Sequence, residues 1–327
     1  MDSYPISSNS LEKFYTINGN LFSTQYKEHL SDYHQWDQKS HANEWILFPD
    51  NIGKHISIDE TSLSQGELYT IVTNKAGKGR KGTLIAMIKG TKAEDVIAIL
   101  KKIPQKSRSK VEEITLDMAG SMNQIARKCF PQAVKVIDRF HVQKLAYDAL
   151  QEMRIAHRWD AINEETNALD NARWEKTEYI PFRFDNGDTK KQLLARSRYL
   201  LFKSAEKWTA SQKQRATILF AQYPDIKQAY NLTHQLRLIF SKTEEKGIAF
   251  TKLARWYNQV TDSGFKSFNT ISATIHSHYL EILNFFENRS TNASAESFNA
   301  KLKAFRACLR GVNDTPFFMY RVAKIYA

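Results

Sequence analysis

The order of strand and helix signals is the feature that most constrains how this chain folds. Between residues 51 and 142, "HISID", "ELYTIVTN" and "GTLIAMIKG" predict three successive strands, and "VEEITLDM" and "AVKVIDRFH" predict two more. "TKAEDVIAILKKI" and "SMNQIARKCF" predict the two helices that separate the last three strands. The order β-β-β-α-β-α-β predicts an α/β fold with a mixed five-stranded sheet and flanking helices. It is the order of the ribonuclease H fold.

The pattern changes after residue 142. Residues 143–286 show helical periodicity almost throughout, and strand signals nearly vanish, which predicts an all-helical insertion of about 145 residues. Residues 1–50 are polar and predict a helical or linker segment. Residues 287–327 predict a last helix that packs back onto the sheet. We therefore expect an α/β core, residues 51–142 and 287–327, that is interrupted by a large all-α domain.

The charge balance indicates a polyanionic partner. Lys and Arg outnumber Asp and Glu by 47 to 35, a net charge of +12, and such an excess most often accompanies nucleic-acid binding. The 42% of hydrophobic residues suffices for a sizeable core. The start "MDSYPISSNS" lacks the pattern of a secretion signal, and no apolar run is long enough for a membrane span. With two cysteines, the expected location is the cytoplasm.

Three carboxylates stand where metal-dependent chemistry needs them. Asp59 and Asp117 each end a predicted strand, so both are expected at one rim of the sheet. Carboxylates that lie close together favour a bound divalent cation. Glu296 begins the last predicted helix and is long enough to reach the same rim. Glu60 faces the opposite side of its strand from Asp59, so only one of the two faces the cation, and we favour Asp59.

The last helix has two distinct faces at 100° per residue. One carries a stripe of apolar residues, Ala295, Phe298, Leu302, Phe305 and Leu309. The neighbouring face carries polar and basic residues, Glu296, Asn299, Lys303, Arg306 and Arg310. The helix is thus predicted to seat its apolar stripe on the sheet, to direct Glu296 toward the strand ends, and to present its basic residues to phosphates.

Four blocks of the sequence, "SIDET", "TLDMAGSM", "VIDRFHV" and "STNASAESFNAKLK", resemble the catalytic blocks of DDE transposases of bacterial insertion sequences. The branch that the chain resembles most is the ISL-type, which has a helical insertion between the second Asp and the Glu. The resemblance covers about residues 50–327. It implies an RNase H-like catalytic core and an enzyme that cleaves and joins DNA strands.

The resemblance also implies roles for individual residues. Asp59, Asp117 and Glu296 would be the three metal ligands and catalytic acids, and they would hold two Mg²⁺ ions, with Mn²⁺ as a substitute. Asp138 and His141 match an Asp-x-x-His element of the family with a supporting role. Asn292 and Asn299, which flank Glu296, are expected to hydrogen-bond Glu296 or a phosphate. For Asn292, capping of the helix is an alternative of at least equal weight.

Clusters of basic residues predict where DNA binds. The glycine-rich stretch "KAGKGRKG" predicts a loop that approaches a duplex backbone closely. Together with the last helix, it gives the expected DNA-binding residues Lys75, Lys78, Arg80, Lys81, Lys303, Arg306 and Arg310. The expected partner is double-stranded DNA, both element ends and target, bound by a homodimer or higher oligomer. No Cys pairs or clear two-helix DNA reader precede the core, which raises the hypothesis that either a separate DNA-recognition polypeptide or the helical insertion reads the element ends.

Two alternatives remain open at this level. An RNase H-fold nuclease or resolvase would carry the same acids and would cut DNA without joining it. A non-catalytic relative would bind DNA only.

Overall fold

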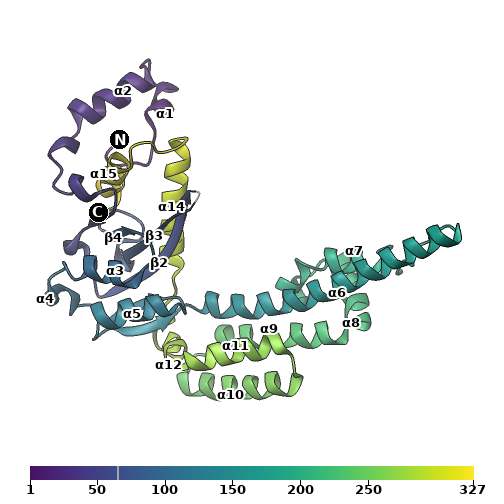
Figure 1. The fold of residues 1–327 in the computed structure, drawn as a ribbon. Coiled ribbons are helices and arrows are strands. Elements are labelled where there is room, and N and C mark those ends of the chain that lie inside the picture. Colours follow the sequence, from purple (N-terminus) through teal and green to yellow (C-terminus); the bar gives the residue numbers. More distant parts are fainter. Residues whose placement is uncertain (65) are drawn as a thin grey trace. The chain divides into compact units, whose positions relative to one another are not determined.

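The computed structural model describes residues 1–64 and 66–327, which divide into two compact units. The first unit combines Met1–Asp138 with Arg289–Ala327, and the second is the continuous segment Arg139–Asn288 (Figure 1). Within the described part of the chain, no helix has both the length and the apolar character that a membrane span requires.

The first unit is built on a six-stranded mixed sheet with the order β1-β4-β3-β2-β5-β6. The strands are β1 Trp45–Leu47, β2 His55–Ser64, β3 Glu67–Asn74, β4 Leu84–Lys89, β5 Glu113–Leu116 and β6 Val134–Ile137. The first four in the sheet pair antiparallel, while β2, β5 and β6 run parallel to one another. The five predicted strands are all present. The sixth, β1, is only three residues long, too short for an alternating pattern to be visible in the sequence.

One predicted strand boundary was wrong. The strand that begins at His55 does not end at Asp59 but continues to Ser64, because its second half pairs with β3 in a long hairpin. The parallel pairing with β5 ends earlier, at the pair Ser57–Thr115. Asp59 therefore lies where β2 extends past β5. At Asp59, the edge of β2 that faces β5 is no longer paired with it.

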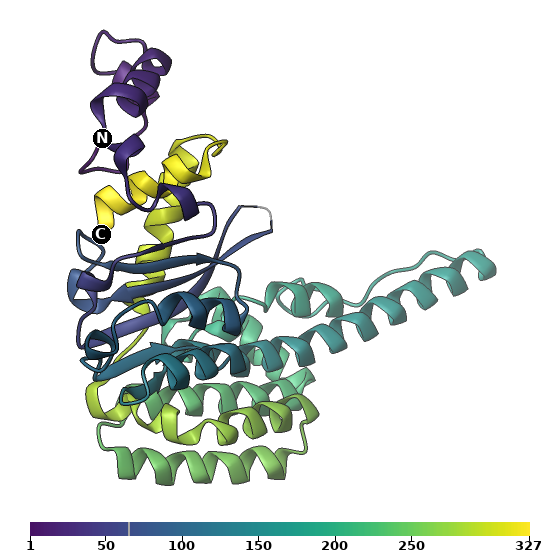
Figure 2. The same ribbon diagram turned by 60° about the vertical axis from the view of Figure 1, so that its left-hand side comes forward.

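Helices cover both faces of this sheet (Figure 2). The α-helices of the first unit are α1 Ser8–Glu12, α2 Gly19–Gln25, α3 Ala93–Leu100, α4 Gln105–Arg108, α5 Gly120–Cys129, α14 Ala293–Cys308 and α15 Thr315–Tyr326. Helices α3 and α5 pack on one face around Ile56, Ile58 and Ile114, whereas α14 and α15 pack on the other. Since successive side chains of a strand alternate in direction, Ser57 and Asp59 point to the α14 side.

Helix α14 is seated as its two-faced pattern predicts. Ala295, Phe298, Leu302 and Phe305 are all buried, and Leu309 packs at the edge of the same core. Figure 1 shows α14 running alongside β2. Full burial of an aromatic or leucine side chain contributes about 1.5–3 kcal/mol, so this stripe fixes the helix firmly against the sheet.

The second unit consists of helices. They are α6 Arg139–Glu175, α7 Lys190–Arg196, α8 Ala210–Gln222, α9 Pro224–Lys242, α10 Lys246–Ser263, α11 Lys266–Ser277, α12 Tyr279–Leu283 and α13 Phe285–Asn288. Helix α9 packs against α6 and α10, and α11 packs against both of these (Figure 2). Trp256, fully buried on α10, donates its indole N–H to the carbonyl of Leu232 at 2.9 Å. Its burial agrees with a role in the core of this unit.

Candidate active site

Three aspartates lie on three neighbouring parallel strands, Asp59 within β2 and Asp117 and Asp138 directly after β5 and β6. Ser57 and Thr115 are the last pair of β2 and β5, and the same register continued by two residues brings Asp59 level with Asp117. Leu116 pairs with Ile137, so one residue later Asp117 stands opposite Asp138. We call Asp59, Asp117 and Asp138 the acidic row. Its alignment follows from strand pairing alone, because parallel strands in register present equivalent residues at the same level of the sheet.

Asp59 is held from both the strand and the facing helix. Its carboxylate accepts a hydrogen bond from the side-chain amide nitrogen of Asn299 at 2.7 Å and one from the backbone N–H of Glu60 at 3.0 Å. Asn299 is buried on α14, directly above β2. Both hydrogen bonds favour the ionised form of the carboxyl group and fix its direction.

Glu60, on the opposite face of β2 from Asp59, adds a carboxyl group close to the row. Burial raises the pKa of Glu60, and the charges of Asp117 and Asp59 raise it further. Asp117 accepts a hydrogen bond from the backbone N–H of Ala119 at 2.8 Å, where the chain turns toward α5. Asp59, Glu60 and Asp117 are therefore electrostatic neighbours that repel one another, a situation that a bound cation would relieve.

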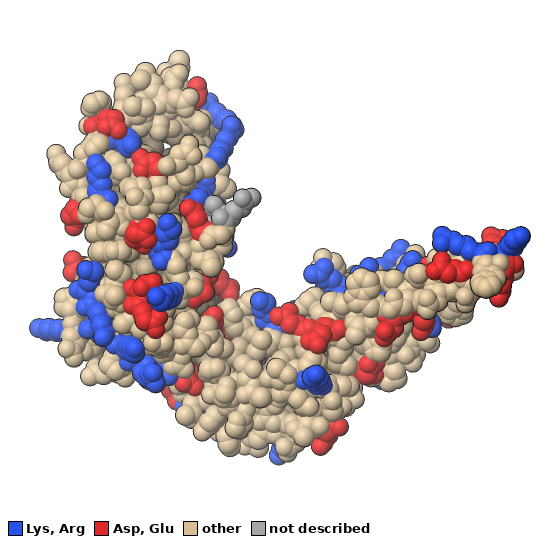
Figure 3. All heavy atoms as spheres, viewed as in Figure 1, with Lys and Arg blue, Asp and Glu red and all other residues tan. Residues whose placement is uncertain are grey.

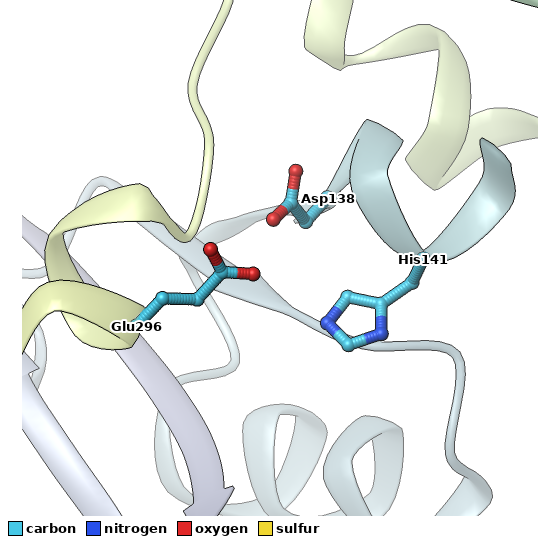
Figure 4. Close-up of side chains that lie close together, drawn as sticks. All are labelled: Asp138, His141 and Glu296. Carbon is cyan, nitrogen blue, oxygen red and sulfur yellow. The ribbon is translucent and has the colours of Figure 1, made fainter. Parts of the chain in front are cut away.

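Asp138 and Glu296 come together although 158 positions separate them in the sequence. Their carboxylate oxygens lie within 4.8 Å of one another, with Asp138 buried and Glu296 exposed (Figure 4). Figure 4 also draws His141, which is the third residue of the second unit and lies in the first turn of α6. Among the described residues, the predicted ligands Asp59, Asp117 and Glu296 do not form a group whose carboxylate oxygens all lie within 4.8 Å of one another.

Asn292 ties the start of α14 to the sheet. Its backbone N–H donates to the carboxylate of Asp138 at 3.2 Å, and its side-chain amide nitrogen donates to the carbonyl of Ile58 at 3.4 Å. Although Asn292 occupies the N-cap position, its side chain makes no capping hydrogen bond. The capping role expected as one alternative for Asn292 is therefore absent, and its side chain contacts the sheet instead.

The donor set fits a hard divalent cation. Beside the carboxylates, the side-chain oxygens of Asn292 and Asn299 are buried and have no hydrogen-bond partner among the described residues. A buried amide oxygen without a donor costs about 1–3 kcal/mol, so such atoms commonly mark a place for water or an ion. Carboxylate and amide oxygens are the ligands that Mg²⁺ prefers, directly or through its water shell. The acidic row, Glu296 and these two oxygens thus suit such an ion.

The predicted DNA-binding residues fall into two groups. Lys78, Arg80 and Lys81 in the glycine-rich loop are exposed, and so are Lys303 on α14 and Arg310, two residues beyond the end of α14. The remaining two make internal contacts instead. Lys75 is mostly buried and lies 3.3 Å from Glu113. Arg306 forms an ion pair with Glu67 at 2.8 Å and lies over the ring of Phe318.

A basic hollow that the sequence did not predict lies between the glycine-rich loop, α14, α15 and the N-terminal residues. It encloses about 670 Å³, and its lining includes Arg80, Lys81, Lys301 and Lys324, with Asp2 as the one acidic side chain among the lining residues. The ammonium of Lys301 donates to the carbonyl of Gly79 at 2.9 Å, which joins α14 to the loop. Lys301 stands only two positions from the predicted Lys303, but it lies outside the polar face that the sequence singled out.

A second basic surface covers α4 and α5. Figure 3 shows Lys and Arg gathered on this part of the first unit. Lys106 lies on α4, Arg127 and Lys128 lie on α5, and Lys101, Lys102 and Lys110 lie in the segments before and after α4; all six are exposed. This surface extends the basic stretch "KKIPQKSRSK" with residues from the following helix.

Comparison with known proteins gives a consistent result. A family model described as "Transposase", of the DDE type of ISL3 elements, matches residues 56–322. The transposase for insertion sequence element IS1001 from Bordetella parapertussis is 20% identical over 271 residues, 82% of this chain and 60% of that protein. The transposase for insertion sequence element IS1557 from Mycobacterium tuberculosis (strain H37Rv) is 23% identical over 251 residues, 76% of this chain and 55% of that protein.

The chain therefore spans about 55–60% of the length of these relatives. No solved structure matches it.

Proposed function

This chain belongs to the ISL3-type family of DDE transposases, and we propose that it catalyses metal-dependent cleavage and strand transfer of DNA at the ends of an insertion sequence. The observation that carries this proposal is the acidic row, with Glu296 of α14 beside Asp138. Carboxylates from three neighbouring strands and from the start of α14 would supply the ligand set for divalent cations.

We propose that the first unit is an RNase H-like core and that the second unit is an all-α insertion in it. The strand order β4-β3-β2-β5-β6, with three antiparallel strands followed by two parallel ones, supports this. The second unit, Arg139–Asn288, enters the chain between Asp138 and Glu296. An insertion at this point separates two acids of the site in the sequence without separating them in the first unit.

We assign Asp59, Asp117 and Glu296 as the ligands of two Mg²⁺ ions, for which Mn²⁺ would substitute. When bound, these ions would activate the attacking hydroxyl group and stabilise the leaving oxygen. Asp138 supports the start of α14 through Asn292 and lies close enough to Glu296 to share a cation with it. His141, three residues after Asp138, is proposed to orient the site or to contact DNA.

The chain's own groups prepare the site for this chemistry. Asn299 holds the Asp59 carboxylate in one direction, and the backbone N–H of Ala119 does the same for Asp117. The apolar stripe of α14 packs against β3 and β4 and fixes the helix that carries Asn299. No serine or tyrosine nucleophile is needed, because water and then a 3′-hydroxyl of the element attack phosphorus directly.

We propose that double-stranded DNA lies along the glycine-rich loop and the exposed side of α14. Lys78, Arg80, Lys81, Lys303 and Arg310 would neutralise its phosphates, and the basic hollow would extend the contact. Phosphate contacts of this kind give affinity and orientation without reading the base sequence. A DNA-bound dimer or higher oligomer, and a separate polypeptide that reads the element ends, remain our proposals, as does a cytoplasmic, nucleoid-associated location.

The decisive experiment uses the purified chain, Mg²⁺ and labelled DNA that carries the terminal repeats flanking the coding sequence. Joined product supports the proposal. Cleavage without joining would identify a nuclease or resolvase, and binding alone would identify a non-catalytic relative. Asp59→Asn is the matched control, because it removes one charge and one ligand while keeping the side chain's size.

A further inference from the structure

A buried lysine lies on the same face of the sheet as the acidic row. Lys75 begins a 3-10 turn, Lys75–Gly77, directly after β3. Its side chain is 16% exposed, and the ammonium contacts Glu113 Oε1 at 3.3 Å and the hydroxyl of Thr115. The side chain of Glu113 is itself only 4% exposed. A lysine in a glycine-rich basic loop ordinarily points to solvent, so this inward direction requires an explanation.

The backbone around Lys75 makes the inward direction a fixed feature. The side-chain oxygen of Asn74 accepts from the backbone N–H of Ala76 at 3.0 Å, and its nitrogen donates to the carbonyl of Asn51 at 2.9 Å. Lys78 closes the turn in the left-handed conformation with φ 51°. The turn is thereby held at both ends, and Lys75 enters the face of the sheet while Lys78 remains outside.

Strand geometry places the ammonium just below the row. Glu113, Thr115 and Asp117 alternate along β5, so their side chains share one face. Two residues of a strand span roughly 7 Å, so Thr115 stands about that far below Asp117. Burial lowers the pKa of Lys75, whereas the negative charge of Asp138 raises it. Asp138 therefore belongs to the negative surroundings of the ammonium group.

We propose that Lys75 is a positioning residue for the acidic row, a built-in cation that sets how tightly the row binds divalent metal ions. The inference rests on the proposed function of the row. Without a metal ion, the ammonium offsets part of the repulsion among Asp59, Asp117 and Asp138. With a metal ion, it opposes the incoming charge. Glu113 lies two residues farther from the row along β5 than Thr115 does. Of the two charges, the ammonium of Lys75 is therefore the one nearer to the metal site.

Two variants test the proposal with shifts in opposite directions. Lys75→Met/Glu113→Gln removes both charges and leaves no buried ion unpaired, so the row should bind Mn²⁺ about three- to tenfold more tightly. Glu113→Gln alone leaves the ammonium without its counter-ion, so Mn²⁺ binding should weaken by a similar factor. Lys75→Arg keeps the charge and should restore an affinity close to that of the unaltered chain.

Binding is measured on the purified full chain without DNA, by the loss of the free Mn²⁺ electron paramagnetic resonance signal. Thermal unfolding of each variant establishes that it is folded. The matched control is Lys92→Met/Glu94→Gln, which removes the same two charges from exposed positions at the start of α3 and should leave affinity unchanged.

Affinities of both test variants within twofold of the unaltered chain would overturn the proposal and assign the pair a purely structural role. If the double variant does not fold, Glu113→Gln alone decides by the same criterion. A chain that binds no Mn²⁺ before any substitution would contradict the proposed function itself, and the inference would fall with it. The two failures are therefore distinguishable.

Discussion

The side-chain amide nitrogen of Asn299 lies 2.7 Å from the Asp59 carboxylate, across 240 positions of sequence. This hydrogen bond joins the middle of α14 to the centre of the sheet at the proposed metal site. It also fixes the orientation of the amide, since the nitrogen faces Asp59 and the oxygen is left buried without a partner among the described residues. One side chain thus directs a proposed catalytic acid and keeps an oxygen available beside it.

We expect Asn299→Ala to lower the rate of DNA cleavage by about 10- to 100-fold, the usual effect of removing a group that orients a metal ligand. Asn299→Asp should be at least as damaging, because it places a second negative charge against Asp59. Cleavage of labelled end DNA at saturating Mg²⁺ measures both. Asn43→Ala, an exposed amide in the same unit, is the control. An Asn299→Ala rate within threefold of the unaltered chain would remove Asn299 from the site.

Single neutralisations of the acids should separate ligands from supporting residues. Asp59→Asn, Asp117→Asn and Glu296→Gln each remove a proposed metal ligand, so cleavage should fall by about 10³-fold or more while DNA binding stays close to normal. Asp138→Asn should have a smaller effect if Asp138 only supports α14. Cleavage and gel-shift assays measure the two properties, and exposed Asp95→Asn is the control.

The short distance between Asp138 and Glu296 allows a second outcome when Asp138→Asn is compared with the other acid variants. Asp138 is the acid that lies within 4.8 Å of Glu296. A loss for Asp138→Asn as large as that for Asp117→Asn would assign Asp138 as a ligand in its own right.

The basic hollow should contribute phosphate contacts. We expect Lys301→Gln and Arg80→Gln each to weaken binding to all DNA sequences alike and to reduce the slope of log affinity against log salt by about 1. Fluorescence anisotropy between about 50 and 200 mM salt measures the slope. Lys89→Gln is the control, because this exposed lysine lies outside the hollow. An unchanged slope for both variants would mean that DNA does not enter the hollow.

The second unit has a stability determinant that depends on pH. Burial alone would raise the pKa of Asp188, but hydrogen bonds and charges from Arg215 and Arg196 hold its pKa below the ordinary value. Arg215 lies 2.9 Å from the carboxylate, which is fully buried. Because the pKa is lower in the folded state, this stabilisation is present above about pH 4 and is lost as the pH falls through the folded-state pKa.

Asp188→Asn should therefore lower the free energy of unfolding by about 2–4 kcal/mol at pH 7, and the difference should shrink toward pH 3. We place the value below that of a fully buried pair because Arg196 is 55% exposed. Urea denaturation at several pH values measures it. Asp170→Asn breaks an exposed ion pair with Arg173 and should change little. Equal losses for both variants would contradict the role of Asp188.

Local patterns in the sequence determined the order of strands and helices, the two faces of α14 and the family. Alternation along β2 and the stripe at Phe298 and Leu302 need no knowledge of distant residues, because period 2 and period 3.6 arise from the backbone itself. The positions of Asp117 and Asp138 after their strands are visible in the same way. That these strands run in matching register, and so align the acids, follows from pairing across the sheet.

Only the tertiary structure decided which charged groups meet. Lys75 and Lys78 are indistinguishable in a basic loop, yet the turn after β3 buries the first against Glu113 and leaves the second in solvent. Arg306 likewise has the spacing of a DNA-binding residue but pairs with Glu67 of β3. The approach of Glu296 to Asp138 depends on where α14 is seated. Such contacts join residues far apart in the chain, and the energy that selects them is that of the whole packed unit.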